Sequence, residues 1–163
     1  MKKIAALFVE IDGCYYNLDN VTPWGEDKDA RTYNLMLPVI AHPPCQRWGR
    51  FWHGSTIKPH QFLQGDDGGC FATALHNVRI HGGVLEHPKD SHAWRWFGLS
   101  KPPVSGGWVK ADDIGGMTCC VYQGHYGHIS GKPTWLYACK SELQELIWGK
   151  TEQRIHPVAL KKH

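Results

Sequence analysis

A cysteine in a restricted, basic setting is the first residue of this sequence that could do chemistry. Cys45 follows two prolines, which limit the backbone before it, and Arg47 and Arg50 come shortly after. Cationic neighbours favour the thiolate form of a cysteine, and the thiolate is the nucleophile. A lone cysteine can also be a small buried hydrophobe. The surroundings of Cys45 favour a functional thiol.

Two further groups of reactive side chains stand where short apolar runs end. Glu86 closes one run, and His125 and His128 follow a later one. In an open α/β sheet, ligands bind beyond the carboxyl ends of the strands. Because Cys45 also follows an apolar run, at residues 38–41, we expect Cys45 and Glu86 to lie at the same edge of a sheet.

The spacing of apolar residues predicts the elements that position these side chains. Strands are expected at residues 4–9, 38–41, 84–86, 108–110, 117–123 and 133–139, and helices at 70–81, 91–97 and 141–148, with one or two helical turns within 27–33 and a turn-rich stretch at 17–29. Asp66 or Asp67 can cap the longest helix, which is a more favourable role for this glycine-rich loop than binding an anion.

The connections between these elements indicate the fold class. A strand, a long helix and a second strand, joined through Gly82 and Gly83, form the pattern of a parallel βαβ unit. No repeat, low-complexity tract or linker divides the chain. We therefore expect one α/β domain over residues 1–163, with residues 150–163 as a tail.

Composition narrows the class of protein. With 163 residues, 42% of them apolar and 12% aromatic, the chain can bury its own core, which excludes a disordered segment. No run approaches the roughly 18 apolar residues of a membrane helix. Glu10 and Asp12 interrupt the apolar N-terminus too early for a signal peptide. The six cysteines show no repeated CxxC spacing, which favours reduced thiols and a cytoplasmic protein without membrane contact.

The order of three motifs resembles a known family. Residues 43–46 read Pro-Pro-Cys-Gln, a signature of DNA cytosine-C5 methyltransferases. Glu86 stands where that family has Glu-Asn-Val, and residues 126–136 resemble its Tyr-Gly-x-Pro-Gln-x-Arg-x-Arg segment. The resemblance implies a Rossmann-like fold with a mostly parallel sheet, truncated relative to the methyltransferases. It also implies that Cys45 attacks C6 of a pyrimidine, that Glu86 contacts N3 and that Lys132 supports the pocket.

The chemistry of such a pair has a physical basis. A pyrimidine is a poor electrophile at C6, and a thiolate adds there more readily when an acid at N3 neutralises the developing charge. The target base must also leave its stack and enter a pocket with aromatic walls. The expected substrate is therefore a pyrimidine base in DNA or in a nucleotide.

The same resemblance implies a site for S-adenosylmethionine. Residues 7–13 weakly resemble the cofactor loop of the family, and residues 26–33 can stand for the acidic segment that contacts the ribose. Small phage and bacterial proteins share this compressed layout. The cofactor-binding residues implied in this way are Phe8, Gly13, Glu26 and Pro43.

A basic and aromatic segment follows Cys45. Arg47 would tune the thiol or contact a phosphate. Residues that would contact a base or a phosphate are Gln46, Trp48, Arg50 and Trp52. The alternative is that these tryptophans cover an edge of the core. Since only 31 residues follow Lys132, we expect a partner protein to supply target recognition.

Two other functions are compatible with the sequence. The first is a catalytically silent module of a phage or prophage that binds a nucleotide or a protein. The second is a metal-dependent hydrolase, because His42 and Cys45 share the three-residue spacing of His125 and His128. These pairs lie on expected loops, and no further pair completes a ligand set, so a bound metal is not expected.

Overall fold

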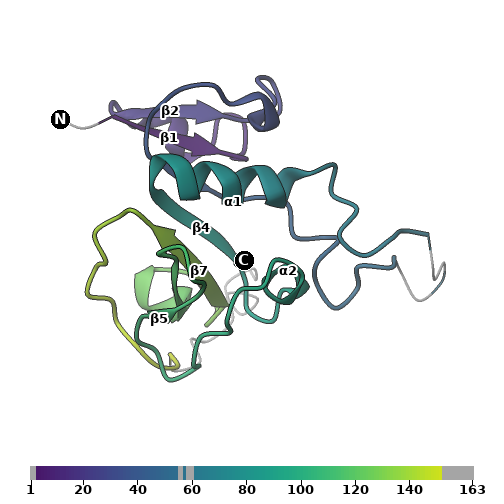
Figure 1. The fold of residues 1–163 in the computed structure, drawn as a ribbon, viewed down its shortest axis with the longest axis vertical. Coiled ribbons are helices and arrows are strands. Elements are labelled where there is room, and N and C mark those ends of the chain that lie inside the picture. The colour runs from purple at the N-terminus through teal and green to yellow at the C-terminus, as the bar shows by residue number, and fades with distance from the viewer. Residues whose placement is uncertain (1–2, 55–56, 58–60, 152–163) are drawn as a thin grey trace, which may run out of the picture.

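The computed structural model describes residues 3–54, 57 and 61–151, so the expected tail lies almost wholly outside the described residues (Figure 1). The strands are β1 (Ile4–Leu7), β2 (Val21–Trp24), β3 (Val39–Ala41), β4 (Gly83–Pro88), β5 (Val109–Lys110), β6 (Met117–Tyr122) and β7 (Pro133–Cys139). The α-helices are α1 (Cys70–His81) and α2 (His92–Trp96), and the 3₁₀ turns are η1 (Cys14–Asn17), η2 (Ala30–Thr32) and η3 (Gln123–Tyr126).

The described strands form one sheet of mixed direction. Its seven strands lie in the order β2-β1-β3-β4-β7-β6-β5. The pairs from β2 to β4 are parallel, and those from β4 to β5 are antiparallel. The mostly parallel sheet expected from the sequence is therefore present only in one half. The connection from β6 to β7, residues 123–132, is too short for the dozen or so residues of a parallel crossover, which explains the antiparallel return.

The expected βαβ unit is confirmed. Strands β3 and β4 pair in parallel, and α1 spans the same residues that the apolar spacing predicts. Gly69 and not Asp66 or Asp67 is the N-cap residue of α1. The carboxylate of Asp67 still accepts hydrogen bonds from the backbone N–H groups of Gly69 and Phe71, both at 2.9 Å, and so stabilises the start of the helix.

Two segments differ from expectation. β2 lies in the stretch expected to consist of turns, because Pro23 obscures the strand pattern; proline is tolerated there since β2 is an edge strand. The helix expected at residues 141–148 is wrong. Its backbone bonds to side chains elsewhere: the carbonyl of Gln144 accepts from Trp108 Nε1, and the N–H of Ile147 donates to Tyr126 Oη.

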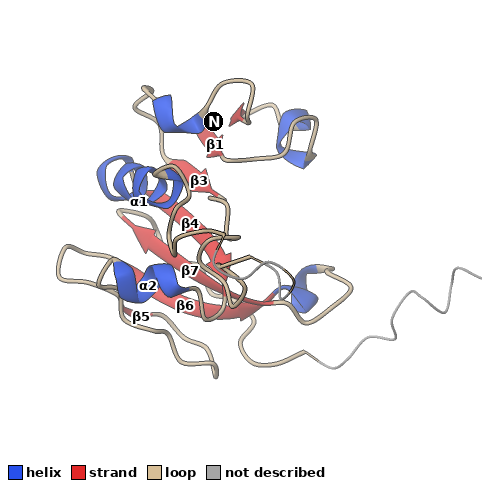
Figure 2. Cartoon of the chain, turned by 90° about the vertical axis from the view of Figure 1, so that its right-hand side faces the viewer, coloured by secondary structure: helices blue, strands red, loops and turns tan. Residues whose placement is uncertain are grey.

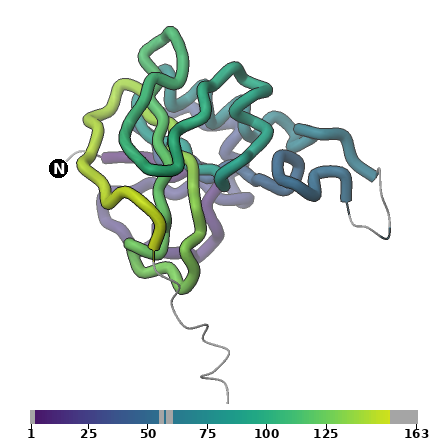
Figure 3. Tube along the Cα trace, turned by 90° about the horizontal axis from the view of Figure 1, so that it is seen from below, coloured from purple at the N-terminus to yellow at the C-terminus, as the bar shows by residue number. Residues whose placement is uncertain are grey.

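The core lies between the sheet and the two α-helices. Figure 2 shows α1 and α2 on the same side of the strands, and the rings of Phe71 on α1 and Trp94 on α2 are in contact. Trp48, Trp94 and Trp135 are all fully buried in this cluster. The described parts of the segment that follows β3, within residues 45–54 and 61–66, project from the body of the molecule (Figure 3). None of the described helices is long and apolar enough to cross a membrane.

Candidate active site

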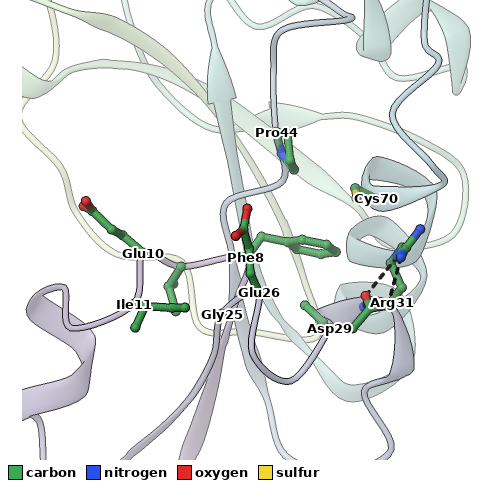
Figure 4. Close-up of a pocket in the computed structure, with 11 residues that line it drawn as sticks. Phe8, Glu10, Ile11, Gly25, Glu26, Asp29, Arg31, Pro44 and Cys70 are labelled. Carbon is green, nitrogen blue, oxygen red and sulfur yellow. Dashed lines mark hydrogen bonds and ion pairs between the residues drawn. The ribbon is translucent and has the colours of Figure 1, made fainter.

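The strand order creates a crevice at one edge of the sheet. The chain passes from β1 outward to β2 and then returns to β3 on the opposite side of β1. Such a reversal is a topological switch point, and ligands bind there beyond the carboxyl ends of the strands. A cavity of about 650 Å³ lies at this place, which we call the switch cavity (Figure 4). Its lining follows β1, β2 and β3 and ends at the start of α1: Phe8, Val9, Glu10, Ile11, Gly25, Glu26, Asp29, Ala30, Arg31, Pro44 and Cys70.

The polar lining of the switch cavity is acidic. Glu10, Glu26 and Asp29 contribute carboxylates, whereas Arg31 is the single cation. Arg31 donates two hydrogen bonds of 2.9 Å to the carboxylate of Asp29, and these bonds lower the pKa of Asp29. With that pair neutralised, Glu10 and Glu26 give the cavity its negative character, which suits hydroxyl donors and cationic ligands.

Phe8 occupies this cavity with a strained backbone. Its φ is +58°, in the left-handed region that a residue with a side chain rarely adopts. In the view of Figure 4 the Phe8 ring lies between the Glu26 carboxylate and Cys70 at the start of α1. Strained residues that persist cluster at ligand sites. The half-buried ring offers an apolar face to a ligand.

The structure separates the residues implied for the cofactor into two groups. Phe8 and Glu26 line the switch cavity, whereas Gly13 and Pro43 are not among its lining residues. Gly13 instead precedes η1, and the next residue after Pro43, Pro44, reaches the cavity.

Gly25 is the glycine of this cavity that sequence reasoning missed. A Cβ on it would lie 2.8 Å from Tyr16 Oη and 2.9 Å from the backbone oxygen of Val9. The residue therefore allows the loops after β1 and β2 to approach closely. Gly25 directly follows β2, a strand that the apolar pattern does not predict, so no sequence signal marked this glycine.

Cys45 and Glu86 lie at the same edge of the sheet, as expected. Ala41 ends β3 and pairs with Leu85, so the chain after β3 and Glu86 both lie just beyond the parallel pairing. Glu86 does not close its strand as expected, because β4 continues to Pro88. Cys45 is exposed, and Glu86 is partly buried. They do not line one described cavity: Cys45 lines a second cavity that does not include Glu86.

Glu86 is held in a hydrogen-bonded chain of side chains that the sequence did not reveal. Its Oε2 lies 2.8 Å from His42 Nδ1, and His42 Nε2 lies 2.8 Å from Tyr15 Oη. On the other side, Gln123 Nε2 donates to Glu86 Oε1 at 3.2 Å and to Thr134 Oγ1 at 2.9 Å. The position of His42 directly before the Pro-Pro-Cys-Gln motif is the one sequence feature that could have pointed to it.

The surroundings of Glu86 and Tyr15 shift their pKa values in opposite directions. Burial alone would raise the pKa of Glu86, but the hydrogen bond from His42 and the positive charges of His42 and Lys132 outweigh it and lower that pKa. Burial, followed by the charges of Cys14 and Glu86, raises the pKa of Tyr15. The His42 ring lies between the two groups, with Nδ1 at Glu86 Oε2 and Nε2 at Tyr15 Oη, so it bridges an ionised Glu86 and a protonated Tyr15.

A second histidine fixes the turn that carries Cys45. His87 is buried, and its Nε2 lies 3.3 Å from the carbonyl oxygen of Pro44 while its Nδ1 lies 2.7 Å from Ser91 Oγ. Burial lowers the pKa of His87, so the neutral ring donates to Pro44 and accepts from Ser91. The turn is fixed further because the backbone N–H of His92 donates to the carbonyl of Trp48 at 2.9 Å.

The cavity that contains Cys45 is basic. Its volume is about 580 Å³, and we call it the basic cavity. Its four lysine and arginine side chains face a single carboxylate, that of Asp90, which pairs with Lys89 at 2.7 Å. The lining residues are Cys45, Gly49, Arg50, Pro88, Lys89, Asp90, Ser91, His92, Arg95 and Lys101.

The residues expected to contact a base or a phosphate take different places. Arg50 lines the basic cavity, and Gln46 is exposed. Trp48 is 2% exposed and donates from Nε1 to Asp67 at 2.8 Å, so it belongs to the core and the base contact predicted for it is wrong. Trp52 is half-buried and packs edge-on against His53.

Arg47 and Lys132 also have definite positions. The Arg47 guanidinium lies 3.4 Å from the centre of the Phe62 ring and donates to the carbonyl of Trp52, which ties the projecting segment together. Lys132 lines a third cavity of about 320 Å³, which adjoins the basic cavity at Lys89, and its charge acts on Glu86.

The histidine pairs do not assemble into a metal site. His125 Nε2 bonds to the carbonyl of Gly149, and His128 bonds locally to Ser130. Within residues 3–54, 57 and 61–151, no three histidine, cysteine or acidic side chains converge in a way that could hold a metal ion.

Comparison of the chain with protein-family models, curated proteins and solved structures finds no match.

Proposed function

We propose that this protein is an S-adenosylmethionine-dependent enzyme that modifies a pyrimidine base, with a truncated Rossmann-like fold and chemistry similar to that of cytosine-C5 methyltransferases. Cys45 is the proposed nucleophile, and Glu86 is the proposed partner of N3. One observation carries the proposal: the turn after β3 lines both cavities, with Pro44 in the switch cavity and Cys45 in the basic cavity. A cofactor and a substrate bound on either side of this turn would be neighbours.

The switch cavity has properties that fit S-adenosylmethionine. Its volume of about 650 Å³ falls in the range of small-molecule sites. Glu26 can accept hydrogen bonds from ribose hydroxyls, Phe8 can pack against the purine ring, and the excess of carboxylates complements a sulfonium cation. When bound, S-adenosylmethionine would supply an electrophilic methyl group.

The proposed work of Cys45 is addition followed by elimination. Its Sγ forms a bond to C6, and the π electrons of the C5–C6 double bond shift onto C5, which takes up an electrophile. C5 then loses its original hydrogen as a proton. The electron pair of that C–H bond restores the double bond, and the pair of the Sγ–C6 bond returns to sulfur.

Glu86 would neutralise the negative charge that develops on the pyrimidine ring when Cys45 adds to C6. To act as an acid at N3 it has to take up a proton, and His42 is in direct contact with it at 2.8 Å. His42 is in turn in contact with the hydroxyl of Tyr15. The proposal therefore assigns to a protonated His42 the transfer of its Nδ1 proton to Glu86, which leaves the imidazole ring neutral, with Lys132 stabilising the negative charge nearby.

Two measurements test the proposal separately. Calorimetric titration with S-adenosylmethionine should give saturable binding, and an absence of heat would remove the methyl-transfer part. Incubation with a single-stranded oligonucleotide that carries tritium at cytosine C5 should release tritium to water without any cofactor, because C5 takes up a solvent proton before elimination. Cys45→Ser should reduce this release by at least about 1,000-fold. Unchanged release by the variant would show that Cys45 is not the nucleophile.

One observation favours a second candidate function, a catalytically silent binding module. Both carboxylate oxygens of Glu86 already have partners, in His42 and Gln123, so the carboxylate must exchange a partner before it can contact a base. A silent module would bind its ligand and release no tritium under any condition.

A further inference from the structure

The basic cavity and the third cavity that adjoins it suggest how a substrate strand is held. We propose that these two cavities form a continuous track for the backbone phosphates of a single-stranded nucleic acid, and that the track leads the strand past Cys45. The proposal rests on the proposed function for the role of Cys45, but the binding of the strand can be measured without any chemistry.

The charge of the track supports an anionic ligand. The basic cavity has four permanent cations and one carboxylate, and the third cavity adds Lys132 and Lys150 without any acidic residue in its lining. The whole chain has 18 lysine and arginine residues against 15 acidic ones, whereas the two linings together have six against one, so positive charge is in excess along this one track. Such local concentration of lysine and arginine is the electrostatic footprint of phosphate binding.

The length of the track favours a polymer over a single phosphate. Lys89 lines both cavities, so the cations form one continuous series that extends from Arg50 and Lys101 to Lys132 and Lys150. A mononucleotide has phosphate at one position and would leave most of these cations unpaired. A strand with one phosphate per nucleotide can engage cations in both cavities.

The shape of the track favours a single strand over a duplex. The cations line recesses of about 580 and 320 Å³, and Cys45 lies within the larger one. A sugar–phosphate backbone can enter such a recess, whereas a duplex is too wide. A base on a single strand is also free to reach Cys45 without the energy that unpairing and unstacking require.

Exposed aromatic rings beside the cations complete the arrangement. Phe51, next to Arg50, and Trp96, next to Arg95, are each 60% exposed. Aromatic rings interleaved with a basic groove stack on unpaired bases and contribute to binding whatever the sequence of the strand. The Arg50 guanidinium lies 5.4 Å from the centre of the Phe51 ring, and the Trp96 ring packs edge-on against the buried Trp48, which fixes its position at the surface.

Fluorescence anisotropy can test the track with a labelled single-stranded oligonucleotide of mixed sequence, long enough to span both cavities. The test variant is Arg95→Gln with Lys101→Gln. The matched control is Lys3→Gln with Lys110→Gln, which removes the same charge from the residue before β1 and from edge strand β5. The cavity variant should weaken binding by at least about 10-fold and reduce the slope of log K against log salt by about 1.4, as expected for two lost phosphate contacts.

The other outcomes each overturn a defined part of the proposal. Equal weakening by the control variant would show non-specific attraction and overturn the track. Equal or tighter binding of the matching duplex would overturn the preference for a single strand. If deoxycytidine monophosphate displaced the labelled strand at concentrations as low as those of an unlabelled strand, the preference for a polymer would be overturned. Strand binding with no tritium release would refute the proposed function and leave the track intact.

Discussion

Pro44 lines the switch cavity and Cys45, the next residue, lines the basic cavity, yet the two cavities differ in charge and in origin. The switch cavity takes its carboxylates from the loops after β1 and β2. The basic cavity takes most of its cations from the segment after β4. One edge of the sheet therefore presents an acidic site and a basic site on either side of a single turn.

This difference in charge indicates that the two cavities bind different ligands. An acidic cavity at a switch point suits a cationic or hydroxyl-rich small molecule, and a basic one suits phosphates. The turn between them is held by His87, which bonds to the carbonyl of Pro44. Substitutions in one cavity should therefore leave the affinity of the other cavity for its ligand unchanged.

The largest loss of stability is expected from Gly25→Ala. The new Cβ would lie within 2.9 Å of the backbone oxygen of Val9, so the loops that form the switch cavity have to move. Overpacking of this kind costs about 1–3 kcal/mol of unfolding free energy. Chemical denaturation should show this loss, and calorimetry should show at least about a 10-fold weaker affinity for S-adenosylmethionine, since 1.4 kcal/mol corresponds to a factor of ten.

Gly49→Ala is the matched control for that substitution. Gly49 lines the basic cavity, and a Cβ there would meet only the carbonyl oxygen of Cys45, at 3.7 Å, which is an ordinary contact. This variant should unfold within about 0.5 kcal/mol of the wild type. Equal damage from both alanines would show that the two cavities do not form independent sites.

A smaller effect is expected from His42→Gln, which removes the ion pair with Glu86. The folded-state pKa of Glu86 is lowered, so Glu86 contributes stability above its ordinary pKa and loses that contribution as the pH falls through the lowered value. The variant should lose about 1–2 kcal/mol at neutral pH. This difference from the wild type should shrink once the pH falls below about 4, where glutamates become protonated.

Tyr15→Phe provides the control for this measurement. It removes the hydroxyl that lies 2.8 Å from His42 Nε2 but leaves the ion pair of His42 with Glu86 in place. Its unfolding free energy should fall less than that of His42→Gln, and the loss should persist at low pH. A loss in His42→Gln that does not depend on pH would contradict an ionised Glu86 as its partner.

The contrast between the cavities also shows how far the sequence could lead. Helix α1 and the pairing of β3 with β4 were predictable, because apolar spacing and paired glycines are local signals. The same signals predicted that Cys45 and Glu86 lie near one edge of the sheet, but not that Glu86 lies inside β4 and outside the cavity of Cys45. Trp48 was ambiguous because an aromatic residue in a basic segment can face either a ligand or the core; its bond to Asp67 determines the outcome.

The properties of the two cavities could not be predicted, because they depend on contacts between distant segments. The basic cavity is lined by the turn after β3 and by residues 88–101. The hydrogen bonds through His42 connect Tyr15 to Glu86, which are 71 positions apart in the sequence. β2, which completes the switch point, is an edge strand with a proline and lacks a strong strand pattern. Long-range pairing decided each of these features.

The smallest loss of stability is expected from Glu26→Gln, which gives the sharpest test of the different ligands assigned to the two cavities. This change keeps the size of the side chain and removes one of the carboxylates of the switch cavity. Loss of a charged hydrogen-bond acceptor should weaken the affinity for S-adenosylmethionine by about 10-fold, as expected for about 1.5 kcal/mol. Strand binding should change no more than in Glu145→Gln, an exposed control of the same charge that lies outside both cavities. If the substitution instead altered strand affinity while cofactor affinity stayed constant, the acidic and basic cavities would have exchanged the roles that their charges assign.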